Sequence, residues 1–538
     1  MSNPAFENQG LVLAIMSSVF LLVVVLYRGY RARRFYRDLP GPPHSWLWGH
    51  ISIFRDITTS MPPNSMPQLY YTEIAHRYNL QGIFYLDLWP IGPGLVIITD
   101  PKLIEQAPIP RPLVPHPMTN TFITPIAGEN NIPTKGGTEW KKLHNLMSPA
   151  FSNAHARSLV SVMVDASRML RSKLDGFSVT GQVFSMEDLM IKVMFEIVSR
   201  HILNAGSCAQ KAGRQDLKDM RELVDLAQEE SNPFIAYNPL VQIPRRLRRH
   251  FVRRKLEASL LGLVYKRLEV LITEGIVPSN KDPTSVLDLM LREHVESAIR
   301  EKEQGRNDSM KLSTPEEKQF VSYLRILLLG GHTTSTTTLS SNLFSQYLFM
   351  LLSKAPHIID KMRQEHTEQL GSNPQATILN NLDMLLKLTY TEAVIKEILR
   401  LYPVGSSLRL GPPSATIYHQ GRHLPIDNYL VIMTNAHVFR PERWLGQNKT
   451  HPGPRYSRPF GGDGRWCPGQ NIAMYILRVI VVMTVGDYTF ECADLKPNFK
   501  ARALHTDIDV AFGDIAFQEL GLEGRPRDGM MMTVRKGA

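Results

Sequence analysis

The chain is poor in cysteine, with only Cys208, Cys467 and Cys492 among its 538 residues. Three cysteines cannot all pair with one another, and so small a number indicates a reducing compartment for most of the chain. We interpret Cys208 and Cys492 as ordinary thiols. The sequence has no zinc-finger spacing and no periodic alternation of basic and aromatic residues, so we expect no nucleic-acid partner.

The chain also lacks a low-complexity linker that would divide it into separate domains. Hydrophobic residues make up 43% of the sequence, which is enough for a sizeable core. With nucleic acid set aside, the net charge of +11 points to an acidic membrane surface or an acidic protein partner.

Residues 11–27 are apolar apart from two serines, and charge is nearly absent before them. Five arginines follow at once: Arg28, Arg31, Arg33, Arg34 and Arg37. By the positive-inside rule, this order predicts a membrane anchor at 11–27 with the rest of the chain in the cytosol. A cleaved signal peptide would carry its positive charge before the apolar run and a small-residue cleavage pattern after it. We therefore prefer an uncleaved anchor over a signal peptide or a mitochondrial presequence, and expect a basic, proline-rich hinge at 28–45.

A cysteine in a glycine-rich turn is the most informative feature of the sequence. Residues 460–469 read FGGDGRWCPG, and a helix start follows. The thiolate of Cys467 would be a strong ligand of haem iron, glycines let the backbone approach a flat macrocycle, and a helix N-terminus favours negative charge. Arg465 can pair with a haem propionate in forked geometry. The alternative is a glycine-rich loop with a buried free cysteine.

A long helix is predicted from a cap at Thr314 to about Leu352. Its middle, residues 329–338, contains two glycines and a run of hydroxyl residues, although each glycine costs about 1 kcal/mol against alanine. Such a helix interior indicates a functional reason for the composition.

Two smaller motifs lie on other predicted helices. Trp140 and His144 fall in a helix that starts at Gly137. Glu397 and Arg400 stand at i and i+3 before a proline, so both charges share one helical face. Residues 439–444, FRPERW, follow this helix and precede the cysteine loop.

Taken in chain order, these motifs resemble those of the cytochrome P450 family, the haem-thiolate monooxygenases. The family's loop pattern, Phe-x-x-Gly-x-Arg-x-Cys-x-Gly, is matched at Phe460, Arg465, Cys467 and Gly469. Residues 329–338 are similar to the family's oxygen-binding helix segment. The anchor, basic patch and proline elbow look like the start of its microsomal members.

The resemblance implies roles for individual residues. Cys467 would be the axial ligand of the haem iron, while Thr333 and Thr334 would relay protons to bound dioxygen. The haem propionates would be held by Arg465, Trp140, His144 and Arg409. A structural network beneath the haem would consist of Glu397, Arg400 and Arg443.

The chain departs from the family pattern in four places. Asp463 replaces a glycine in the loop, His144 replaces an arginine, and Thr333 stands where the family has an acid. About a dozen residues that the family carries before Val438 are absent, judged against that pattern. This absence is either a true shortening or a mispredicted exon.

The fold implied is mainly α with a smaller β-rich subdomain, preceded by one transmembrane helix. Residues 1–10 would be lumenal, and residues 46–538 would form the haem-thiolate catalytic domain on the cytosolic side of the endoplasmic reticulum membrane. Strands are expected at 82–88 and 94–99. The proline-rich stretch 107–136 reads as a long loop, which by resemblance shapes the substrate pocket. The basic run 245–255 is either a solvated helix face or a contact with anionic lipid.

The activity implied is insertion of one oxygen atom from O2 into an apolar small molecule, as in fungal members that tailor terpenoids, polyketides or alkaloids. Electrons would come from NADPH through cytochrome P450 reductase, with cytochrome b5 as a further donor. Two alternatives stay open. One is a haem-thiolate isomerase or dehydratase that needs no reductase, and the other is a haem-binding protein with impaired catalysis.

Overall fold

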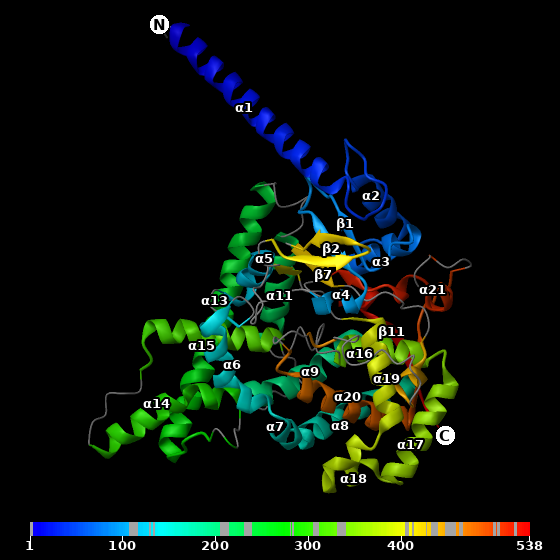
Figure 1. Cartoon of the computed structure of the whole chain (residues 1–538). Helices are drawn as coiled ribbons and strands as arrows, with labels where there is room; N and C mark the ends of the chain where they lie inside the picture. The colour runs from blue at the N-terminus through cyan, green and yellow to red at the C-terminus, as the bar shows by residue number, and fades with distance from the viewer. Residues whose placement is uncertain are drawn as a thin grey trace. The chain divides into compact units, whose positions relative to one another are not determined.

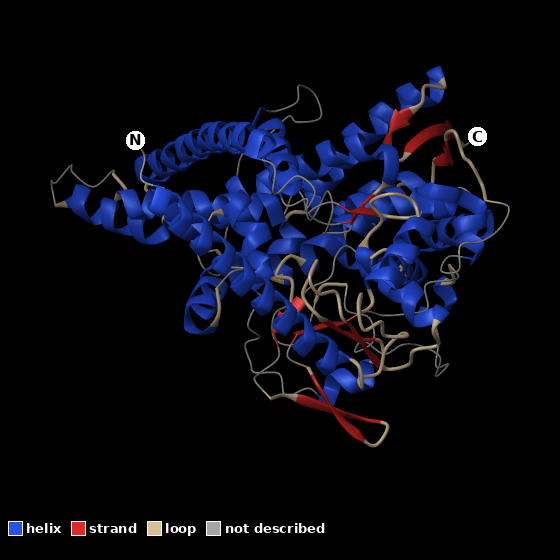
Figure 2. Ribbon diagram, turned by 90° about the horizontal axis from the view of Figure 1, so that it is seen from above, coloured by secondary structure: helices blue, strands red, loops and turns tan. Residues whose placement is uncertain are grey.

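The computed structural model describes most of the chain. The described ranges are 4–106, 117–128, 131–132, 135–204, 215–230, 239–279, 281, 285–304, 311–330, 341–403, 408–410, 414–426, 428–431, 439–446, 459–461, 466–498, 502, 506–520 and 524–537. Helices account for most of these residues, and the strands form short ribbons (Figure 1, Figure 2). The chain divides into two compact units, each described in turn.

Unit 1 comprises residues 1–63, 67–109 and 407–434. Its elements are α1 (Pro4–Tyr36), α2 (Ile51–Ser60), α3 (Pro67–Arg77), β1 (Ile83–Leu86), β2 (Leu95–Ile98), α4 (Pro101–Gln106), β4 (Leu408–Leu410), β5 (Thr416–His419), β6 (Arg422–Pro425) and β7 (Asn428–Val431). The main sheet has the order β1-β2-β7-β4, in which β2 and β7 are parallel and the other neighbours antiparallel.

The core of unit 1 lies between this sheet and the hairpin β5–β6. Strands β1 and β2 are buried along their whole length, because their side chains are apolar on both faces. The Tyr85 hydroxyl donates a hydrogen bond to the Pro425 carbonyl at 2.7 Å and joins the hairpin to the sheet. The two strands predicted at 82–88 and 94–99 are thus confirmed.

Helix α1 contains a segment, Ile15–Tyr36, that is long and apolar enough to cross a membrane. The helix runs unbroken from Pro4 to Tyr36 (Figure 1), and so extends beyond both ends of the anchor predicted at 11–27. The predicted boundaries at residues 10, 27 and 45 stay predictions.

Unit 2 comprises residues 64–66, 110–406 and 435–538. Its elements are α5 (Pro117–Ala127), α6 (Gly137–Met147), η1 (Ser148–Phe151), α7 (Asn153–Ser158), α8 (Val160–Thr180), β3 (Phe184–Ser185), α9 (Met186–Leu203), α11 (Gln215–Glu230), α13 (Pro239–Glu274), α14 (Val286–Glu303), α15 (Thr314–Leu328), α16 (Ser341–Leu352), α17 (Pro356–Leu370), α18 (Pro374–Asn380), η3 (Leu382–Leu386), α19 (Thr389–Leu401), η4 (Pro441–Trp444), α20 (Gln470–Val485), β8 (Tyr488–Cys492), α21 (Thr506–Phe512), η5 (Gly513–Ala516), β9 (Glu519–Leu520), β10 (Gly524–Arg525), η6 (Arg527–Gly529) and β11 (Met531–Lys536). Two small sheets join β3-β11-β8 and β10-β9.

Helix α20 lies at the centre of unit 2. Every residue from Tyr475 to Val485 is buried, and a helix that is apolar on all sides needs neighbours on all sides. Helices α8, α16, α17 and α19 supply them (Figure 1). The helix that follows the cysteine loop is therefore a core element with a fixed position in this unit.

Two local expectations were wrong. The stretch 107–136 is not all loop, because α5 forms within it and begins at Pro117. Proline is tolerated at the first helical position, where its missing N–H has no partner in any case. Helix α15 is capped by Ser313 instead of Thr314, and Ser313 and Glu316 exchange the two hydrogen bonds of a capping box.

The predicted long helix from 314 to 352 is described in two parts. Helix α15 ends at Leu328, Leu329 and Gly330 widen into a π-type turn, and α16 begins at Ser341. Local widening of this kind is common at functional sites. Residues 331–340 lie outside the described part of the chain.

His155 and His201 form a buried pair between α7 and α9. Their ring nitrogens Nε2 and Nδ1 are 3.1 Å apart. Burial, aided by the neighbouring His155, lowers the pKa of His201 from 6.5 to about 3. His201 therefore binds a proton more readily in the unfolded chain than in the folded one, so acid favours unfolding.

We predict that the contribution of His201 to the free energy of unfolding is fully present above about pH 6.5. It falls by roughly 1.4 kcal/mol per pH unit as the pH drops toward 3. His201→Gln keeps a hydrogen-bonding side chain without a titratable ring. Its loss of stability between about pH 7.5 and pH 5.5 should be smaller than that of the wild type by roughly 1.4 kcal/mol. Thermal unfolding followed by circular dichroism measures the difference.

The matched control is His357→Gln on the exposed side of α17. It should keep the acid sensitivity of the wild type. Equal acid sensitivity of the His201 and His357 variants would contradict the prediction.

Candidate functional site

Cys467 lies two residues before Gly469, which is the N-cap of α20. Its carbonyl accepts from the Gln470 N–H at 3.3 Å, and the Gly469 carbonyl accepts from the Ala473 N–H at 2.9 Å. The Cys467 side chain is partly exposed. The positive end of a helix dipole favours a negatively charged group nearby, so this position suits a thiolate.

The cysteine loop is closed by its own backbone. The Cys467 N–H donates to the Phe460 carbonyl at 2.8 Å, and the Phe460 side chain is buried. Gly461 has a φ of 83°, in the left-handed region that favours glycine. Phe460, Cys467 and Gly469 are thus brought together as the motif predicted, while Arg465 and Asp463 lie outside the described residues.

The other described cysteine has a different environment. Cys492 ends strand β8, and burial raises the pKa of its thiol to about 12. A thiol that stays protonated is a poor metal ligand and a poor nucleophile. This supports the interpretation of Cys492 as an ordinary thiol, while Cys208 lies outside the described residues.

Glu397 is a buried carboxylate with several hydrogen-bond donors around it. It is fully buried, and Arg400 donates to both of its oxygens, each at 2.9 Å. The Arg443 Nε donates to Oε1, also at 2.9 Å. Burial lowers the pKa of the Arg443 guanidinium, and the Glu397 charge opposes that effect. The three residues predicted to form one network are therefore in contact.

Two further members of this network were missed. The Arg440 backbone N–H donates to Glu397 Oε1 at 3.0 Å, and the Trp444 indole Nε1 donates to Oε2 at 3.0 Å. A buried carboxylate has about four acceptor positions, so more than two partners were to be expected. Trp444 follows Arg443 directly in the sequence, and this adjacency was the available signal.

A second set of contacts holds the short helix η4 in place. Glu442 accepts hydrogen bonds from the Tyr390 hydroxyl at 2.9 Å and from Lys361 Nζ at 2.8 Å. These partners come from α19 and α17. Helix η4 is thus held both by the hydrogen bonds to buried Glu397 and by the hydrogen bonds that Glu442 accepts.

The same helix α19 is tied to the cysteine helix α20. Arg478 Nη2 donates to Glu392 Oε2 at 2.8 Å, and the Arg478 side chain is buried. Burial opposes ionisation of Glu392, yet hydrogen bonds from Lys396 and Arg478 lower its pKa. Helix α19 therefore connects η4, through Glu397, with α20, through Glu392.

Trp140 and His144 share a face of α6, with ring centroids 5.0 Å apart. Residues four apart on a helix are neighbours, which accounts for this contact. Arg409 is the middle residue of β4 and pairs with Tyr429 of β7, and its side chain is not described. Thr333 and Thr334 lie outside the described residues.

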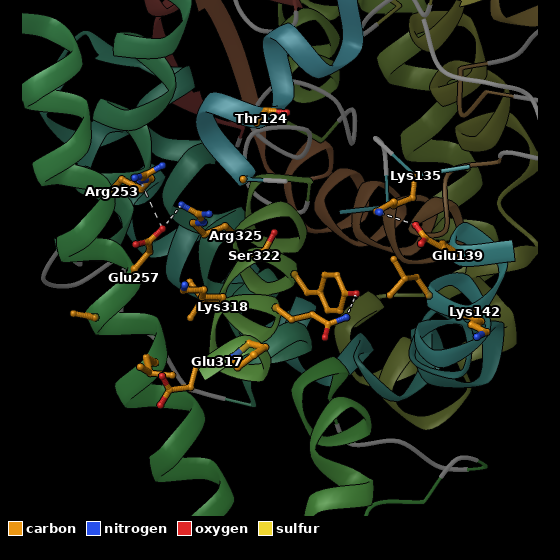
Figure 3. Close-up of a pocket in the computed structure, with 18 residues that line it drawn as sticks. Thr124, Lys135, Glu139, Lys142, Arg253, Glu257, Glu317, Lys318, Ser322 and Arg325 are labelled. Atoms are coloured by element: carbon orange, nitrogen blue, oxygen red, sulfur yellow. Dashed lines mark hydrogen bonds and ion pairs between the residues drawn. The ribbon is translucent and has the colours of Figure 1, made fainter. Parts of the chain in front are cut away.

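Unit 2 also contains an open cavity of about 1030 Å³ between α5, α6, α13 and α15 (Figure 3). Charged side chains line much of it: Lys135, Glu139, Lys142, Arg253, Glu257, Glu317, Lys318 and Arg325. These charged residues were not expected from the sequence, which predicted an apolar substrate pocket. Parts of that expected pocket, in 107–116, 331–340 and 404–407, lie outside the described residues.

An ion-pair cluster forms one wall of this cavity. Arg325 and Arg253 converge on Glu257, with N–O distances of 2.7 and 3.7 Å (Figure 3). Arg325 also donates to the Ala127 carbonyl at 3.0 Å. Gly128 has a φ of 86°, in the left-handed region that favours glycine, and a Cβ there would lie 2.6 Å from Arg325 Nη2. The cluster joins α5, α13 and α15.

The side chains of the cysteine loop and of α6 suit a haem group. A partly exposed thiol at a helix N-terminus supplies a ligand suited to iron. The aromatic and imidazole rings of Trp140 and His144 carry N–H donors that suit carboxylates such as haem propionates. The residues present thus match the chemistry that a haem group requires.

Comparison with known proteins assigns a family to this arrangement. Residues 39–506 match the family model described as Cytochrome P450. Curated relatives include the cytochrome P450 monooxygenase acrF of Aspergillus aculeatus, 27% identical over 89% of this chain and 99% of its own. Another is polC of Polytolypa hystricis, 26% identical over 91% and 90%. A third is ptmG of Penicillium ochrochloron, 25% identical over 97% and 94%.

Solved structures confirm the fold. The crystal structure of a cytochrome P450, CYP102L1, has a TM-score of 0.65 at 18% identity and covers 88% of this chain and 98% of its own. The haem domain of cytochrome P450DA has a TM-score of 0.65 at 17% identity, with coverage of 93% and 98%. The predicted architecture, mainly α with a smaller β-rich part and one N-terminal apolar helix, is therefore confirmed.

Glu397 gives a direct test of the network. Removing a buried charge leaves its partners unpaired, and such a loss costs about 3–5 kcal/mol. We predict that Glu397→Ala lowers the haem content of the purified protein severalfold, because Arg400 and Arg443 lose their counter-charge. The haem-to-protein ratio of purified protein is the measurement.

The matched control is Glu368→Ala at an exposed position of α17. Its effect on stability should stay within about 0.5 kcal/mol, as is usual for surface substitutions. Normal haem content in Glu397→Ala would show that the network does not support the site.

Proposed function

Since the chain belongs to the cytochrome P450 family, we propose that it oxidises an apolar terpenoid, polyketide or alkaloid in fungal secondary metabolism. As a family member it is a haem-thiolate monooxygenase, an oxidoreductase that carries haem. The fungal origin of acrF, polC and ptmG supports the proposed substrate class. When bound, haem supplies the iron that activates O2 with electrons from NADPH.

One observation carries the assignment of the haem ligand. Cys467 lies at the start of α20, and its N–H is held by the Phe460 carbonyl at 2.8 Å. This bond fixes the backbone of the loop, and the helix end favours the thiolate form. We assign Cys467 as the axial ligand on this basis, with Phe460 and Gly469 shaping the loop.

The remaining site residues are assigned by resemblance. Arg465, Trp140, His144 and Arg409 would bind the haem propionates, with forked hydrogen bonds from the arginines and single ones from the two rings. Thr333 and Thr334 would hold water and pass protons through their hydroxyl groups.

The structural network has a separate function. Glu397, Arg400 and Arg443 would hold the protein beneath the haem without touching a substrate. Their support is the set of short hydrogen bonds to one buried carboxylate.

The location and partners follow from the N-terminal helix and the family. We propose that α1 anchors the protein in the endoplasmic reticulum membrane by its apolar part, up to about Tyr27, with the catalytic part in the cytosol. As a member of the family it takes a redox partner and a small-molecule substrate. Cytochrome P450 reductase is proposed as this partner, with cytochrome b5 as a further electron donor.

The haem ligand can be tested spectroscopically. Cys467→Ala should lose the thiolate-type Soret band of the reduced, carbon-monoxide-bound protein, because alanine offers no ligand to iron. Cys492→Ala is the control and should keep the wild-type band, since its thiol is buried and protonated. A thiolate-type band that persists in Cys467→Ala would contradict the assignment.

The reaction is tested by isotope labelling. Membranes that contain the protein and a reductase should convert an apolar substrate to a product with one oxygen atom from ¹⁸O2, and only with NADPH present. Mass spectrometry of the product measures this. Turnover without NADPH would instead support a haem-thiolate isomerase or dehydratase, a reading that Thr333 in place of an acid favours.

A further inference from the structure

The described part of α1 has one protein-facing stripe, and it starts where the apolar run ends. Apolar side chains from Leu13 to Tyr27 are largely exposed, with Phe20 at 70% and Tyr27 at 59%. Gly29 and Arg33 are buried and Tyr36 is half-buried. The spacing of these three residues, i, i+4 and i+7, places them on one face of the helix. The last two turns of α1 therefore pack against the rest of unit 1.

Glycines allow this close packing. A Cβ at Gly29 would lie 2.7 Å from Trp89 Cζ3, so the Trp89 ring rests directly on the helix backbone. A Cβ at Gly94 would overlap the Tyr36 hydroxyl. Trp89 and Gly94 flank the turn that joins β1 and β2. The helix thus packs at two points against the turn between β1 and β2.

A buried ion pair fixes the same helix face. Arg33 Nη1 lies 2.6 Å from Asp87 Oδ2, and both side chains are almost completely buried. Arg33 Nη2 also donates to the Trp89 carbonyl at 2.8 Å and to the Leu47 carbonyl at 3.1 Å. His44 Nε2 lies 3.0 Å from the same Asp87 oxygen. Arg33 therefore connects α1, the turn after β1 and the segment around Leu47.

Arg33 differs from its neighbours in this respect. Arg28, Arg31, Arg34 and Arg37 are all exposed. They suit contact with lipid phosphates, whereas Arg33 is turned into the protein.

The segment held by Arg33 presents apolar side chains to the outside. Trp46, Leu47 and Trp48 are 54%, 72% and 57% exposed. Their backbone is fixed, because Ser45 and Gly49 bridge each other with N–O distances of 3.0 and 2.7 Å. Three adjacent exposed apolar residues on a rigid turn are unusual for a water-facing surface.

The level at which this turn lies beside α1 indicates whether lipid headgroups or water surround it. The Trp46 ring packs edge-on against Tyr30, with centroids 5.8 Å apart. Tyr30 is three residues beyond Tyr27, which is about 4.5 Å along the helix axis. The interfacial layer of a bilayer is about 5–8 Å thick on each side. If the hydrocarbon core ends at Tyr27, Tyr30 and Trp46 therefore lie in that layer, where tryptophan and tyrosine are favoured.

We infer that the Trp46–Trp48 turn is a second membrane contact, held in the phospholipid interface by rigid docking of α1 on unit 1. The Gly29–Trp89 packing and the Arg33–Asp87 pair keep the anchor from swinging about the proline-rich hinge. The chain thus meets the membrane by a spanning helix and an interfacial aromatic turn at a fixed mutual position. This inference rests on the membrane anchoring proposed above.

The test uses the full-length, haem-loaded protein in vesicles of phosphatidylcholine brominated near the headgroup end of its acyl chains. Bromine quenches tryptophan emission at short range. Trp46→Phe/Trp48→Phe should lose most of the quenching seen in the wild type. Gly29→Leu should lose most of the quenching that depends on these two tryptophans, because the new side chain collides with Trp89.

The matched control is Gly176→Leu in α8, where a Cβ would meet nothing within 4 Å. It should be quenched as strongly as the wild type. Equal quenching of the wild type and the double tryptophan variant would overturn the inference, as would unchanged Trp46- and Trp48-dependent quenching in Gly29→Leu.

Carbonate extraction separates this inference from the proposed anchor. We expect the wild type and all variants to remain in the membrane pellet. In that case the quenching alone tests whether the Trp46–Trp48 turn contacts the membrane. Release of the wild type by carbonate would overturn the anchor and this inference together.

Discussion

A single buried carboxylate organises the region around the candidate haem site. Glu397 has no exposed surface and accepts hydrogen bonds from two guanidinium groups, an indole and a backbone amide. A charge in this position is tolerated only when all its acceptor positions are matched. Helix α19 and the segment 439–446 must therefore keep one mutual arrangement, and any other arrangement would leave several buried groups unpaired.

That constraint extends to the cysteine through helix packing. Glu392, on the same helix as Glu397, holds the buried Arg478 of α20, and Cys467 lies just before α20 begins. The short bond from the Cys467 N–H to Phe460 then closes the loop itself. The thiol is thus placed by rigid elements, as a metal ligand needs to be. The ion pairs contribute specificity of position, and burial of the apolar face of α20 contributes most of the stability.

Local chemistry made much of this site predictable from sequence. The cysteine among glycines before an apolar helix and the Glu397–Arg400 pair are short-range signals, and the structure shows the contact between Glu397 and Arg400. The contact of Glu397 with Arg443, 46 positions away, was expected only from the family resemblance. The Arg478–Glu392 pair spans 86 positions, and no pattern in the sequence links the two. The packing of Trp89 against Gly29 was also missed, because no pattern in the sequence links these two residues. Helix α5 was missed because its prolines read as loop, although Pro117 occupies a first helical position.

The central claim is that this chain holds haem iron through the Cys467 thiolate, in a loop that the Glu397 network keeps in place. X-ray absorption at the iron edge of the purified, haem-loaded protein tests it most directly, because sulfur scatters differently from nitrogen and oxygen. The account predicts one sulfur atom in the first coordination shell of the wild type. A shell of nitrogen and oxygen alone, in protein with full haem content, would contradict it.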